Sequence, residues 1–375
     1  MINEKFNIAI FSPNQNPYSE TFIQAHKNYL EGNIFYYYGT GINTQLENSA
    51  RVFDKKSNWF YKSYSIIANK PKHYHQAVIL SRSLRQHKID IALIQYGTHA
   101  AHLLPVFERC GIPFVVHFHG YDASIRTIVK GNNSYQSVFK NAASVLVVSK
   151  KMEEMVMDMG CSADKLVLNH YGAQPLFNQI QCKFSKPQFI AIGRFVDKKA
   201  PYYTILAFSK IVDLFPEARL IIAGNGVLYN TCRNLVKHLE LEDKVKLAGV
   251  ITPEKFQEYL QESMAFVQHS VTALNGDMEG TPLAVIEAST AGLPVISTYH
   301  AGIPDVILHG KTGLLCEEHD VNEMAANMVK VLADREYAMQ LGKAGKKHMA
   351  SNYSFERHIN NLKQVLHKAT NKTVS

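Results

Sequence analysis

The chain has 375 residues, of which 46% are hydrophobic and 19% charged, and its formal net charge is +8. This length and composition are typical of a globular protein with two domains and exclude a disordered or fibrous one. No uninterrupted apolar stretch approaches the ~20 residues that a membrane-spanning helix needs. The five cysteines are scattered and include no C-x2-C pair, so neither structural disulfides nor a zinc site is expected.

The first residues read MINEKFNIAIFSP, with a β-type run where a secretory signal would need an apolar region and a cleavage site. We therefore expect a cytoplasmic protein. Short β-type runs then alternate with helical stretches, which is typical of parallel sheets joined by crossover helices. The expected strands cover residues 6–11, 89–96, 113–118, 144–149 and 165–171 in the first half, and 188–193, 218–224, 244–250, 264–270 and 293–299 in the second.

A strand-poor stretch at 172–187 separates these two sets of strands. The pattern predicts an α/β protein with two Rossmann-like domains, residues 1–178 and 187–352, whose strand ends face a shared cleft. Residues 353–375 carry apolar side chains at helical spacing and predict a final helix.

Most of the excess positive charge lies in residues 51–88, which hold nine basic residues and one acidic residue. The same window contains Trp59, Phe60 and Tyr61. Basic side chains mixed with aromatic ones suit an anionic membrane surface, which we expect as a partner. A solvated basic face is the alternative, and no nucleic acid partner is expected.

The stretch GDMEGTPLAVIEASTAGLP, residues 276–294, indicates a helix that begins in the middle of the segment. Thr281 is a good N-cap and Pro282 suits the first helical position, while Gly292 suits the end. The free N–H groups of residues 280–284, at the positive end of the helix dipole, then form a site for an anion, most simply a phosphate.

Two glutamates, Glu279 and Glu287, flank this predicted anion site. Carboxylates suit the vicinal hydroxyls of a ribose or a hexose, because they accept the hydrogen bonds that hydroxyls donate. A phosphate with a polyol on either side describes a nucleotide sugar. The alternative is a capped surface helix with two solvated glutamates.

Other motifs support the nucleotide-sugar interpretation. They are GRFVDKKAP (193–201), AGNGVL (223–228), LAGVITPEKF (247–256), VQHSVTALNGDMEGTP (267–282) and AGIPDVILHGKTGLL (301–315). Their order and spacing resemble those of the retaining glycosyltransferases of family 4, which have the GT-B fold. The resemblance implies that the final helix, within residues 353–375, crosses back to pack on the first domain. In the first half, SETFI (19–23), VVHFHGYD (115–122) and VVSKKMEEMV (147–156) resemble the branch that builds bacterial exopolysaccharide, capsule or lipopolysaccharide.

The resemblance implies roles for residues of the second half. Arg194 and Lys199 would clamp the diphosphate in place of a metal ion, with Lys198 as a solvated neighbour. Glu279 would hold the donor sugar and Glu287 the ribose. The remaining donor-binding residues would be Gly224, Val250, Gly280, Thr281, Pro282 and Leu283. Surface charge is the alternative for the Arg–Lys pair.

In the first half, the resemblance places His119 beside the donor sugar, so the catalytic residues would be His119, Arg194, Lys199 and Glu279. His117 points the other way in its strand and is expected in the core. Asp122 would support the loop or contact the acceptor. The segment Ser19, Glu20 and Thr21 would contact the acceptor or cap a helix.

We therefore expect a retaining hexosyltransferase that needs no metal and no cofactor, with a UDP- or GDP-linked sugar as its substrate. The expected acceptor is a lipid-linked or growing surface glycan, reached at the inner face of the cell membrane. The alternatives are a small soluble acceptor and a non-catalytic nucleotide-sugar-binding module. An oxidoreductase is disfavoured because no G-x-G-x-x-G follows the first strand.

Overall fold

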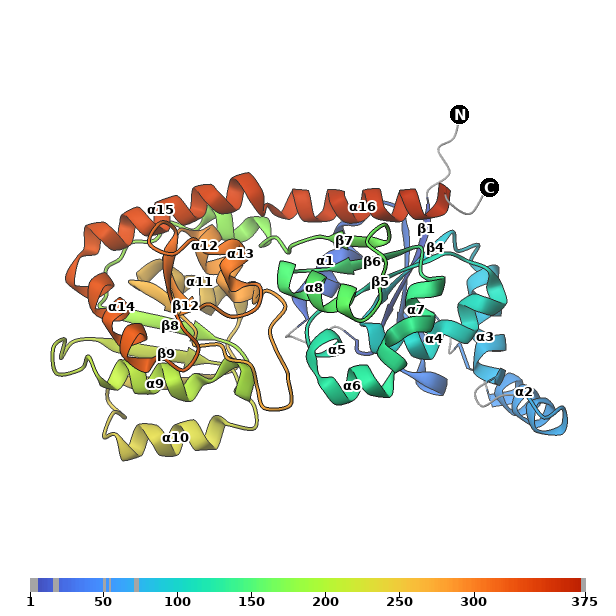
Figure 1. The fold of residues 1–375 in the computed structure, drawn as a ribbon, viewed down its shortest axis with the longest axis horizontal. Helices are drawn as coiled ribbons and strands as arrows, with labels where there is room; N and C mark the ends of the chain where they lie inside the picture. The colour runs from blue at the N-terminus through green and yellow to red at the C-terminus, as the bar shows by residue number, and fades with distance from the viewer. Residues whose placement is uncertain (1–5, 16–19, 50–51, 54, 71–73, 372–375) are drawn as a thin grey trace. The chain divides into compact units, whose positions relative to one another are not determined.

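The computed structural model describes residues 6–15, 20–49, 52–53, 55–70 and 74–371. The chain forms two compact units, in each of which helices flank a mainly parallel sheet (Figure 1). Unit 1 comprises Met1–Val148, Met152–Asn169 and Ile359–Ser375, and unit 2 comprises Ser149–Lys151 and His170–His358. Apart from Ser149–Lys151, the chain passes from unit 1 to unit 2 at 169/170, earlier than the predicted domain end at 178.

The sheet of unit 1 has seven strands in the order β3-β2-β1-β4-β5-β6-β7, and only the β2–β3 pairing is antiparallel. Its strands are β1 (Asn7–Ser12), β2 (Asn33–Tyr38), β3 (Gln45–Leu46), β4 (Ile91–Gln95), β5 (Phe114–His117), β6 (Ser144–Val147) and β7 (Leu166–Leu168). The connecting helices are α1 (Thr21–Tyr29), η1 (Gly41–Asn43), α2 (Lys55–Ile67), α3 (Tyr74–Gln86), α4 (Gly97–Cys110), α5 (Tyr121–Ser124), α6 (Arg126–Gly131), η2 (Asn133–Tyr135), α7 (Gln136–Asn141) and α8 (Lys150–Asp158).

The sheet of unit 2 has six parallel strands in the order β10-β9-β8-β11-β12-β13, the order of a doubly wound Rossmann sheet. Its strands are β8 (Gln188–Ile192), β9 (Arg219–Ala223), β10 (Val245–Gly249), β11 (Ala265–Val267), β12 (Val295–Thr298) and β13 (Gly313–Cys316). The helices are η3 (Pro175–Gln179), η4 (Asp197–Lys199), α9 (Pro201–Ser209), α10 (Tyr229–His238), α11 (Pro253–Glu262), α12 (Leu283–Ala291), α13 (Ile303–Val306), α14 (Val321–Ala333) and α15 (Arg335–Asn352).

The α/β class with two parallel sheets is confirmed, and each predicted strand is present within a few residues of its expected bounds. The sequence interpretation missed β2, β3 and β13. β3 has only two residues, and β13 lies inside a glycine-rich motif that indicates a loop. β2 reads NIFYYY, and its aromatic residues favour a strand, so its signal was present in the sequence.

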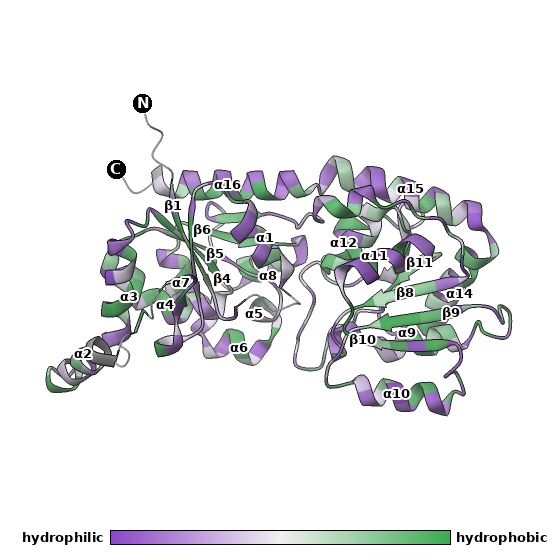
Figure 2. Cartoon of the chain, turned by 180° about the vertical axis from the view of Figure 1, so that it is seen from behind, coloured by the Kyte–Doolittle hydropathy of each residue, from purple (hydrophilic) through white to green (hydrophobic). Residues whose placement is uncertain are grey.

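Hydrophobic residues concentrate on the strands, as Figure 2 shows for β8 and β9. Every residue of β4 and β5 is buried, including the predicted core residue His117. Strands covered on both faces are expected to lack alternation, since neither face meets water. All five cysteines are free thiols. Within the described parts of the chain, no helix is long and apolar enough to cross a membrane.

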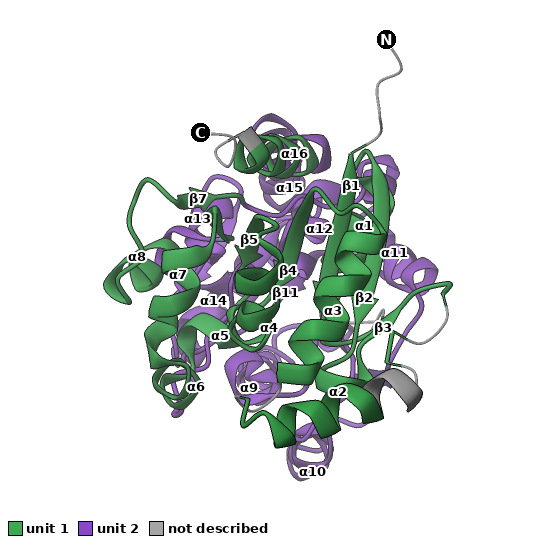
Figure 3. Ribbon diagram, turned by 90° about the vertical axis from the view of Figure 1, so that its right-hand side faces the viewer, with its two compact units in different colours: residues 1–148, 152–169, 359–375 green, residues 149–151, 170–358 purple. Residues whose placement is uncertain are grey.

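The last helix, α16 (Phe355–Asn371), contributes to both units (Figure 3). Its residues up to His358 group with unit 2, and those from Ile359 group with unit 1. Leu362 and Leu366 are buried, and the ring of His367 stacks on Phe6 at 4.9 Å between centroids. The final residues of α16 therefore complete the core of unit 1.

Candidate functional site

Unit 2 holds the candidate site at the carboxyl ends of β8 and β11. These neighbouring strands form the switch point of the sheet, because the strand order runs outward in opposite directions from them. Ligands of doubly wound sheets bind at such a point. Gly193 and Arg194 directly follow β8, and Gln268 directly follows β11. The fold thus places a predicted clamp residue where a ligand is expected.

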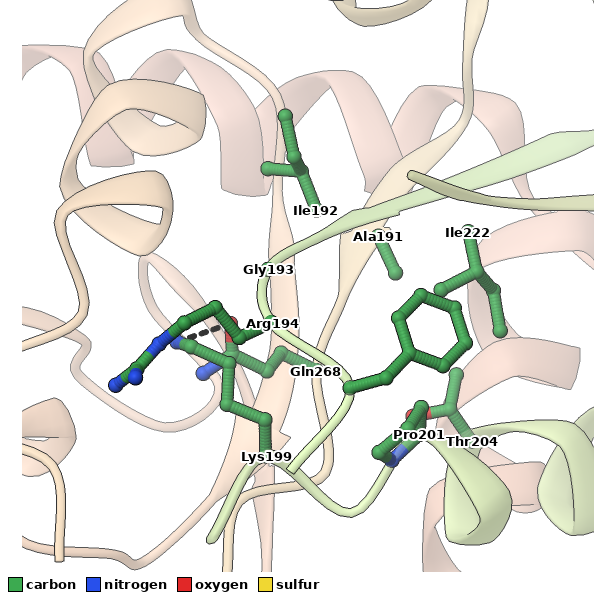
Figure 4. A pocket seen from close by; sticks show the side chains of 10 residues that line it. Ala191, Ile192, Gly193, Arg194, Lys199, Pro201, Thr204, Ile222 and Gln268 are labelled. Atoms are coloured by element: carbon green, nitrogen blue, oxygen red, sulfur yellow. Dashed lines mark hydrogen bonds between the residues drawn. The ribbon is translucent and has the colours of Figure 1, made fainter. Parts of the chain in front are cut away.

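Lys199 ends the short turn η4, and its side chain returns over the end of β8. A Cβ on Gly193 would lie 2.6 Å from Lys199 Cδ, so only glycine leaves room for this path. The Lys199 ammonium lies 3.1 Å from Glu279 Oε1 and 3.5 Å from Gln268 Oε1. Figure 4 shows Lys199, Gln268 and Arg194 around the pocket. The structure therefore brings two predicted catalytic residues, Lys199 and Glu279, into contact.

The Lys199–Glu279 pair is largely removed from water, with side chains 15% and 10% exposed. It is an ion pair by distance, although its angles are not those of a hydrogen bond. Burial raises the pKa of Glu279, but the charges of Lys199 and Lys198 outweigh it and bring the pKa to about 2. Burial lowers the pKa of Lys199, and Glu279 opposes that shift. Glu279 is therefore a carboxylate that can accept hydrogen bonds from sugar hydroxyls.

Arg194 is the exposed member of this group. Its charge acts on Lys199, which places two cations beside the end of β8. Preplaced cations of this kind stabilise negative charge that develops on a leaving phosphate.

Lys198 was expected to be solvated, and this prediction is wrong. The residue is only 6% exposed, and its ammonium pairs with Asp277 Oδ1 at 2.9 Å and donates to the Met278 carbonyl at 3.1 Å. A buried lysine needs such partners because its charge loses the stabilisation of water. Lys198 thus anchors the loop that precedes Glu279.

The helix after Glu279 begins later than expected. Thr281 is not its N-cap; Pro282 occupies that position, and α12 starts at Leu283. Thr281 is instead buried at 3% exposure, and a Cβ on Gly302 would lie 2.2 Å from its Oγ1, so its hydroxyl packs against the neighbouring loop. The prediction that Gly280, Thr281 and Leu283 present backbone N–H groups to phosphate remains a prediction.

Glu287 lies inside α12, and burial raises its pKa to about 7. A carboxyl group with this pKa is partly protonated at neutral pH. Hydrogen bonds donated to it stabilise its charged form. Gly224 has φ +128, and a Cβ there would lie 1.9 Å from the Gly193 carbonyl oxygen, so it allows the ends of β8 and β9 to approach. Val250, predicted to border the base, is 55% exposed.

In unit 1, His119 follows β5 and is part of a line of hydrogen bonds. Its Nε2 lies 2.7 Å from Gln95 Oε1, and the Gln95 amide nitrogen lies 3.2 Å from His26 Nδ1. Gln95 and His26 are fully buried. With the amide in this orientation, His119 carries its proton on Nε2 and donates it to Gln95. Gln95 therefore sets the tautomer of His119.

The Asp122 carboxylate supports the loop and is not placed to contact an acceptor. It is fully buried and accepts hydrogen bonds from the backbone N–H groups of Gly97, His119 and Gly120 at 2.9, 3.1 and 3.0 Å. Burial raises the pKa of Asp122, and these three bonds oppose the shift. The structure thus supports the first of the two predicted roles, in which Asp122 stabilises the loop. Its carboxylate is not exposed to a glycan.

Of the remaining acceptor candidates, Ser19 lies outside the described residues. Glu20 occupies the N-cap of α1 without a capping bond from its side chain, and Thr21 is the first residue of that helix. The Glu20 carboxylate instead accepts from the Tyr96 hydroxyl at 2.9 Å and the Asn14 amide at 3.3 Å. The capping role predicted for Glu20 is therefore wrong, and its acceptor contact stays a prediction.

Sequence reasoning missed Gln95, Gln268 and His300, although each lies within hydrogen-bonding distance of a predicted site residue. Gln95 ends β4 and Gln268 directly follows β11, but both lie inside the longer strands that the sequence predicted, 89–96 and 264–270. In the described part of the chain, no group of three or more His, Cys, Asp or Glu residues is arranged to hold a metal ion.

Two doubly wound units with a basic and acidic site at a switch point define an α/β protein of the GT-B class. The family model for glycosyl transferases group 1 matches residues 175–348, and that for glycosyltransferase family 4 matches residues 47–174. The chain belongs to glycosyltransferase family 4.

Among curated proteins, the chain is similar to the amylovoran biosynthesis glycosyltransferase AmsK of Erwinia amylovora, with 30% identity over 260 residues. The match covers 68% of this chain and 64% of that protein's length. Among solved structures, sucrose-phosphate synthase from Thermosynechococcus elongatus has a TM-score of 0.75 at 16% identity, covering 98% of this chain and 100% of the other. Anabaena HepE in complex with UDP and glucose has a TM-score of 0.72 at 14% identity, covering 97% and 99%. These two likenesses concern the fold.

Proposed function

We propose that this protein is a retaining glycosyltransferase that moves a hexose from a nucleotide sugar to a lipid-linked glycan during synthesis of a bacterial surface polysaccharide. The observation that carries the proposal is the contact between Lys199 and Glu279 at the switch point of unit 2. A cation for a departing phosphate then lies beside a carboxylate for sugar hydroxyls, which are the two groups that transfer from a nucleotide sugar requires.

The comparisons support the choice of substrate. AmsK is a biosynthetic glycosyltransferase for amylovoran, and HepE was crystallised with UDP and glucose. The donor is a UDP- or GDP-linked hexose, and the first experiment is a thermal-shift screen with UDP, GDP and their sugars. A ligand that binds only the native state raises its melting temperature. A parent protein that responds to neither nucleotide would contradict the proposal.

Transfer is expected to survive chelation of divalent metals. Arg194 and Lys199 supply the positive charge that a metal ion supplies in other transferases, so the diphosphate needs no further cation. The measurement is the rate of transfer after treatment with EDTA, with and without added Mg²⁺ or Mn²⁺. A rate that falls on chelation and returns with metal would contradict this mechanism. The anomeric configuration of the product, read by NMR, tests retention separately.

A non-catalytic nucleotide-sugar-binding module is the second candidate from another class. The pairing of Glu279 with Lys199 is its best support, because a carboxylate already held by a cation is less available to a sugar. Hydrolysis or transfer of the donor distinguishes the two. A module would bind the nucleotide sugar and leave it intact with every acceptor.

We also propose that unit 1 docks on an anionic membrane through α2. Trp59, Phe60, Ile66 and Ile67 are 71%, 59%, 71% and 86% exposed. Their spacing of one, seven and eight residues places them on one face of a helix. Lys62 of α2 is exposed, and so is Lys70, which follows the helix within the basic window 51–88. An exposed apolar stripe in a basic helix is the pattern of a segment that lies in a membrane interface.

The membrane proposal is tested by co-sedimentation with liposomes of phosphatidylglycerol and phosphatidylcholine. Each engaged basic residue contributes about 1 kcal/mol near such a surface, so binding should appear at low salt and weaken as salt rises. Replacement of Trp59 and Ile67 by serine should abolish it. Leu214→Ser, at a residue of unit 2 that is 68% exposed, is the matched control. A parent protein that ignores these liposomes would favour a soluble acceptor.

A further inference from the structure

The loop that carries Glu279 is fastened at its end by a buried histidine from another part of unit 2. His300 follows β12, and its side chain is fully buried. Its Nε2 lies 3.1 Å from the backbone nitrogen of Glu279. The Gly302 backbone nitrogen also donates to the Gly280 carbonyl at 2.9 Å. The segment after β12 therefore holds the two residues at the end of the Glu279 loop.

The partners of His300 settle which of its nitrogens carries a proton. A backbone N–H can only donate, so Nε2 must accept from Glu279 and cannot be protonated. The proton then lies on Nδ1, which donates to Glu318 Oε1 at 2.6 Å. An imidazole that accepts on one side and donates on the other depends on its carboxylate partner to keep this tautomer.

Glu318 is well placed for this role, because further hydrogen bonds fix its carboxylate. Its Oε2 accepts from the Thr272 backbone nitrogen at 2.8 Å, and its Oε1 accepts from the Thr272 hydroxyl at 3.2 Å. Burial raises the pKa of Glu318, but the hydrogen bonds from His300 and Thr272 outweigh it, and the pKa is lowered. Glu318 is therefore a carboxylate that holds His300 on one side and Thr272 on the other.

Thr272 and Glu279 lie near the two ends of the loop between β11 and α12. The His300–Glu318 pair thus joins both ends, since Glu318 binds the first and His300 binds the second. Inside the loop, short-range bonds such as Ala273 N–H to the Asp277 carbonyl at 3.0 Å maintain a turn. Lys198 already binds the middle of the loop at Asp277 and Met278, and the pair adds long-range connections near its two ends.

We infer that His300 is a positioning residue, which acts through the backbone of Glu279 to hold its carboxylate against Lys199 and the donor sugar. This role rests on the proposed transferase function. His300 touches neither the sugar nor the phosphate in this role. Its loss should therefore lower kcat while the affinity for nucleoside diphosphate stays within about twofold of the parent.

Two substitutions of similar size separate the two hydrogen bonds. In His300→Gln the amide oxygen reaches the place of Nε2 and still accepts from Glu279 N–H. In His300→Asn the shorter amide reaches only the place of Nδ1, so it keeps Glu318 and loses Glu279. We expect kcat within about fivefold of the parent for His300→Gln and a 10- to 100-fold loss for His300→Asn. Equal losses in the two variants, or a loss of nucleotide affinity as large as the loss of kcat, would overturn the inference.

Glu318→Ala provides a second variant whose side chain is already 23% exposed and therefore less critical for folding. It leaves His300 without its fixing carboxylate, and kcat should fall about tenfold. An unchanged kcat in this folded variant would count against the role of the pair.

A measurement that needs no transfer activity separates this inference from the proposed function. In protein labelled with ¹⁵N-histidine, NMR should show an imidazole signal with the proton on Nδ1 at pH 7 that is absent from His300→Gln and altered in Glu318→Ala. His269 and His358 also carry their protons on Nδ1 by their hydrogen bonds, and their signals should remain in both variants. A His300 signal with the proton on Nε2 would overturn the inference even in an active enzyme. If this signal is found but the protein transfers sugar from no donor, the proposed function is wrong and the role of His300 in holding the loop remains supported.

Discussion

Replacing Lys199 by methionine is expected to lower the kcat of sugar transfer on the order of 10²-fold or more, equivalent to ~3 kcal/mol. The reason is that negative charge on the departing phosphate grows as the bond to the sugar breaks, and Lys199 is a preplaced cation beside it. Methionine keeps the apolar stem that passes over Gly193. Donor affinity should change less than kcat, because the charge is greatest in the transition state.

Arg194→Ala should cause a similar loss of kcat with little effect on stability, because the side chain is exposed. Lys246→Met is the matched control, since Lys246 is an exposed lysine of the same sheet. Steady-state kinetics with the identified donor decide the matter. Turnover within a few-fold of the parent in both Arg194→Ala and Lys199→Met would remove these residues from the mechanism.

The Lys199 variant also leaves the Glu279 carboxylate without its closest cation. Breaking a buried ion pair from one side costs about 3 kcal/mol of folding free energy, because the remaining charge is uncompensated. The double variant Lys199→Met with Glu279→Gln should therefore regain stability in chemical denaturation without regaining activity. This combination separates the catalytic loss from the structural one.

The second large effect concerns the two glutamates, which are expected to fail in different ways. Glu279→Gln should lower kcat on the order of 10²-fold while the affinity for nucleoside diphosphate is nearly unchanged, because in the proposed function its carboxylate binds the sugar and not the nucleotide. Glu287→Gln should weaken nucleoside diphosphate binding, since it alters the ribose contact. Calorimetry with the nucleotide alone makes the distinction. Equal losses of affinity in the two variants would mean that the roles are wrongly assigned.

The raised pKa of Glu287 adds a pH dependence with a definite sign. In the free protein this pKa is about 7, and ribose hydroxyls favour the charged form. Nucleotide binding should therefore strengthen as pH rises from 6 to 7 and release a proton there, which calorimetry in buffers of different ionisation enthalpy detects. Glu287→Gln should lower the number of protons released, leaving only the part that comes from the terminal phosphate. Binding that is independent of pH in the parent would contradict the ribose contact.

The same pKa affects stability. The pKa of Glu287 in the folded state lies above its ordinary value of 4.5. Its contribution to the free energy of unfolding is therefore fully present below pH 4.5 and is lost as pH rises through 7. Glu287→Gln should thus stabilise the free protein at pH 8, by at most about 3 kcal/mol.

Local patterns predicted the two sheets well, because a buried parallel strand is a short apolar run that ends at a turn. They also placed Arg194 and Lys199 near a strand end, since β8 and the residues after it are adjacent in the sequence. The position of α12 was less well predicted. Thr281 has the chemistry of an N-cap, but α12 begins one residue later with Pro282 as its N-cap, and the Thr281 hydroxyl packs against Gly302.

The contacts that organise the site join residues far apart in the chain, and no local pattern encodes them. In the sequence Lys198 looks like a solvated neighbour of Lys199. Its burial depends on Asp277, which lies far away in the chain. His300 stands just before the motif AGIPDVILHGKTGLL, yet its partners Glu279 and Glu318 come from two other loops. Such partners become visible only when the strand order brings the loops together.

The division of α16 between the units has a consequence for the newly made chain. Unit 2 ends at His358, whereas unit 1 needs Leu362, Leu366 and His367 from later in the sequence. During synthesis, every residue of unit 2 is therefore made before the last residues of unit 1. Domains generally fold as units in the order of their synthesis. Here the amino-terminal unit reaches its mature core last, and until then Phe6 lacks the ring that stacks on it.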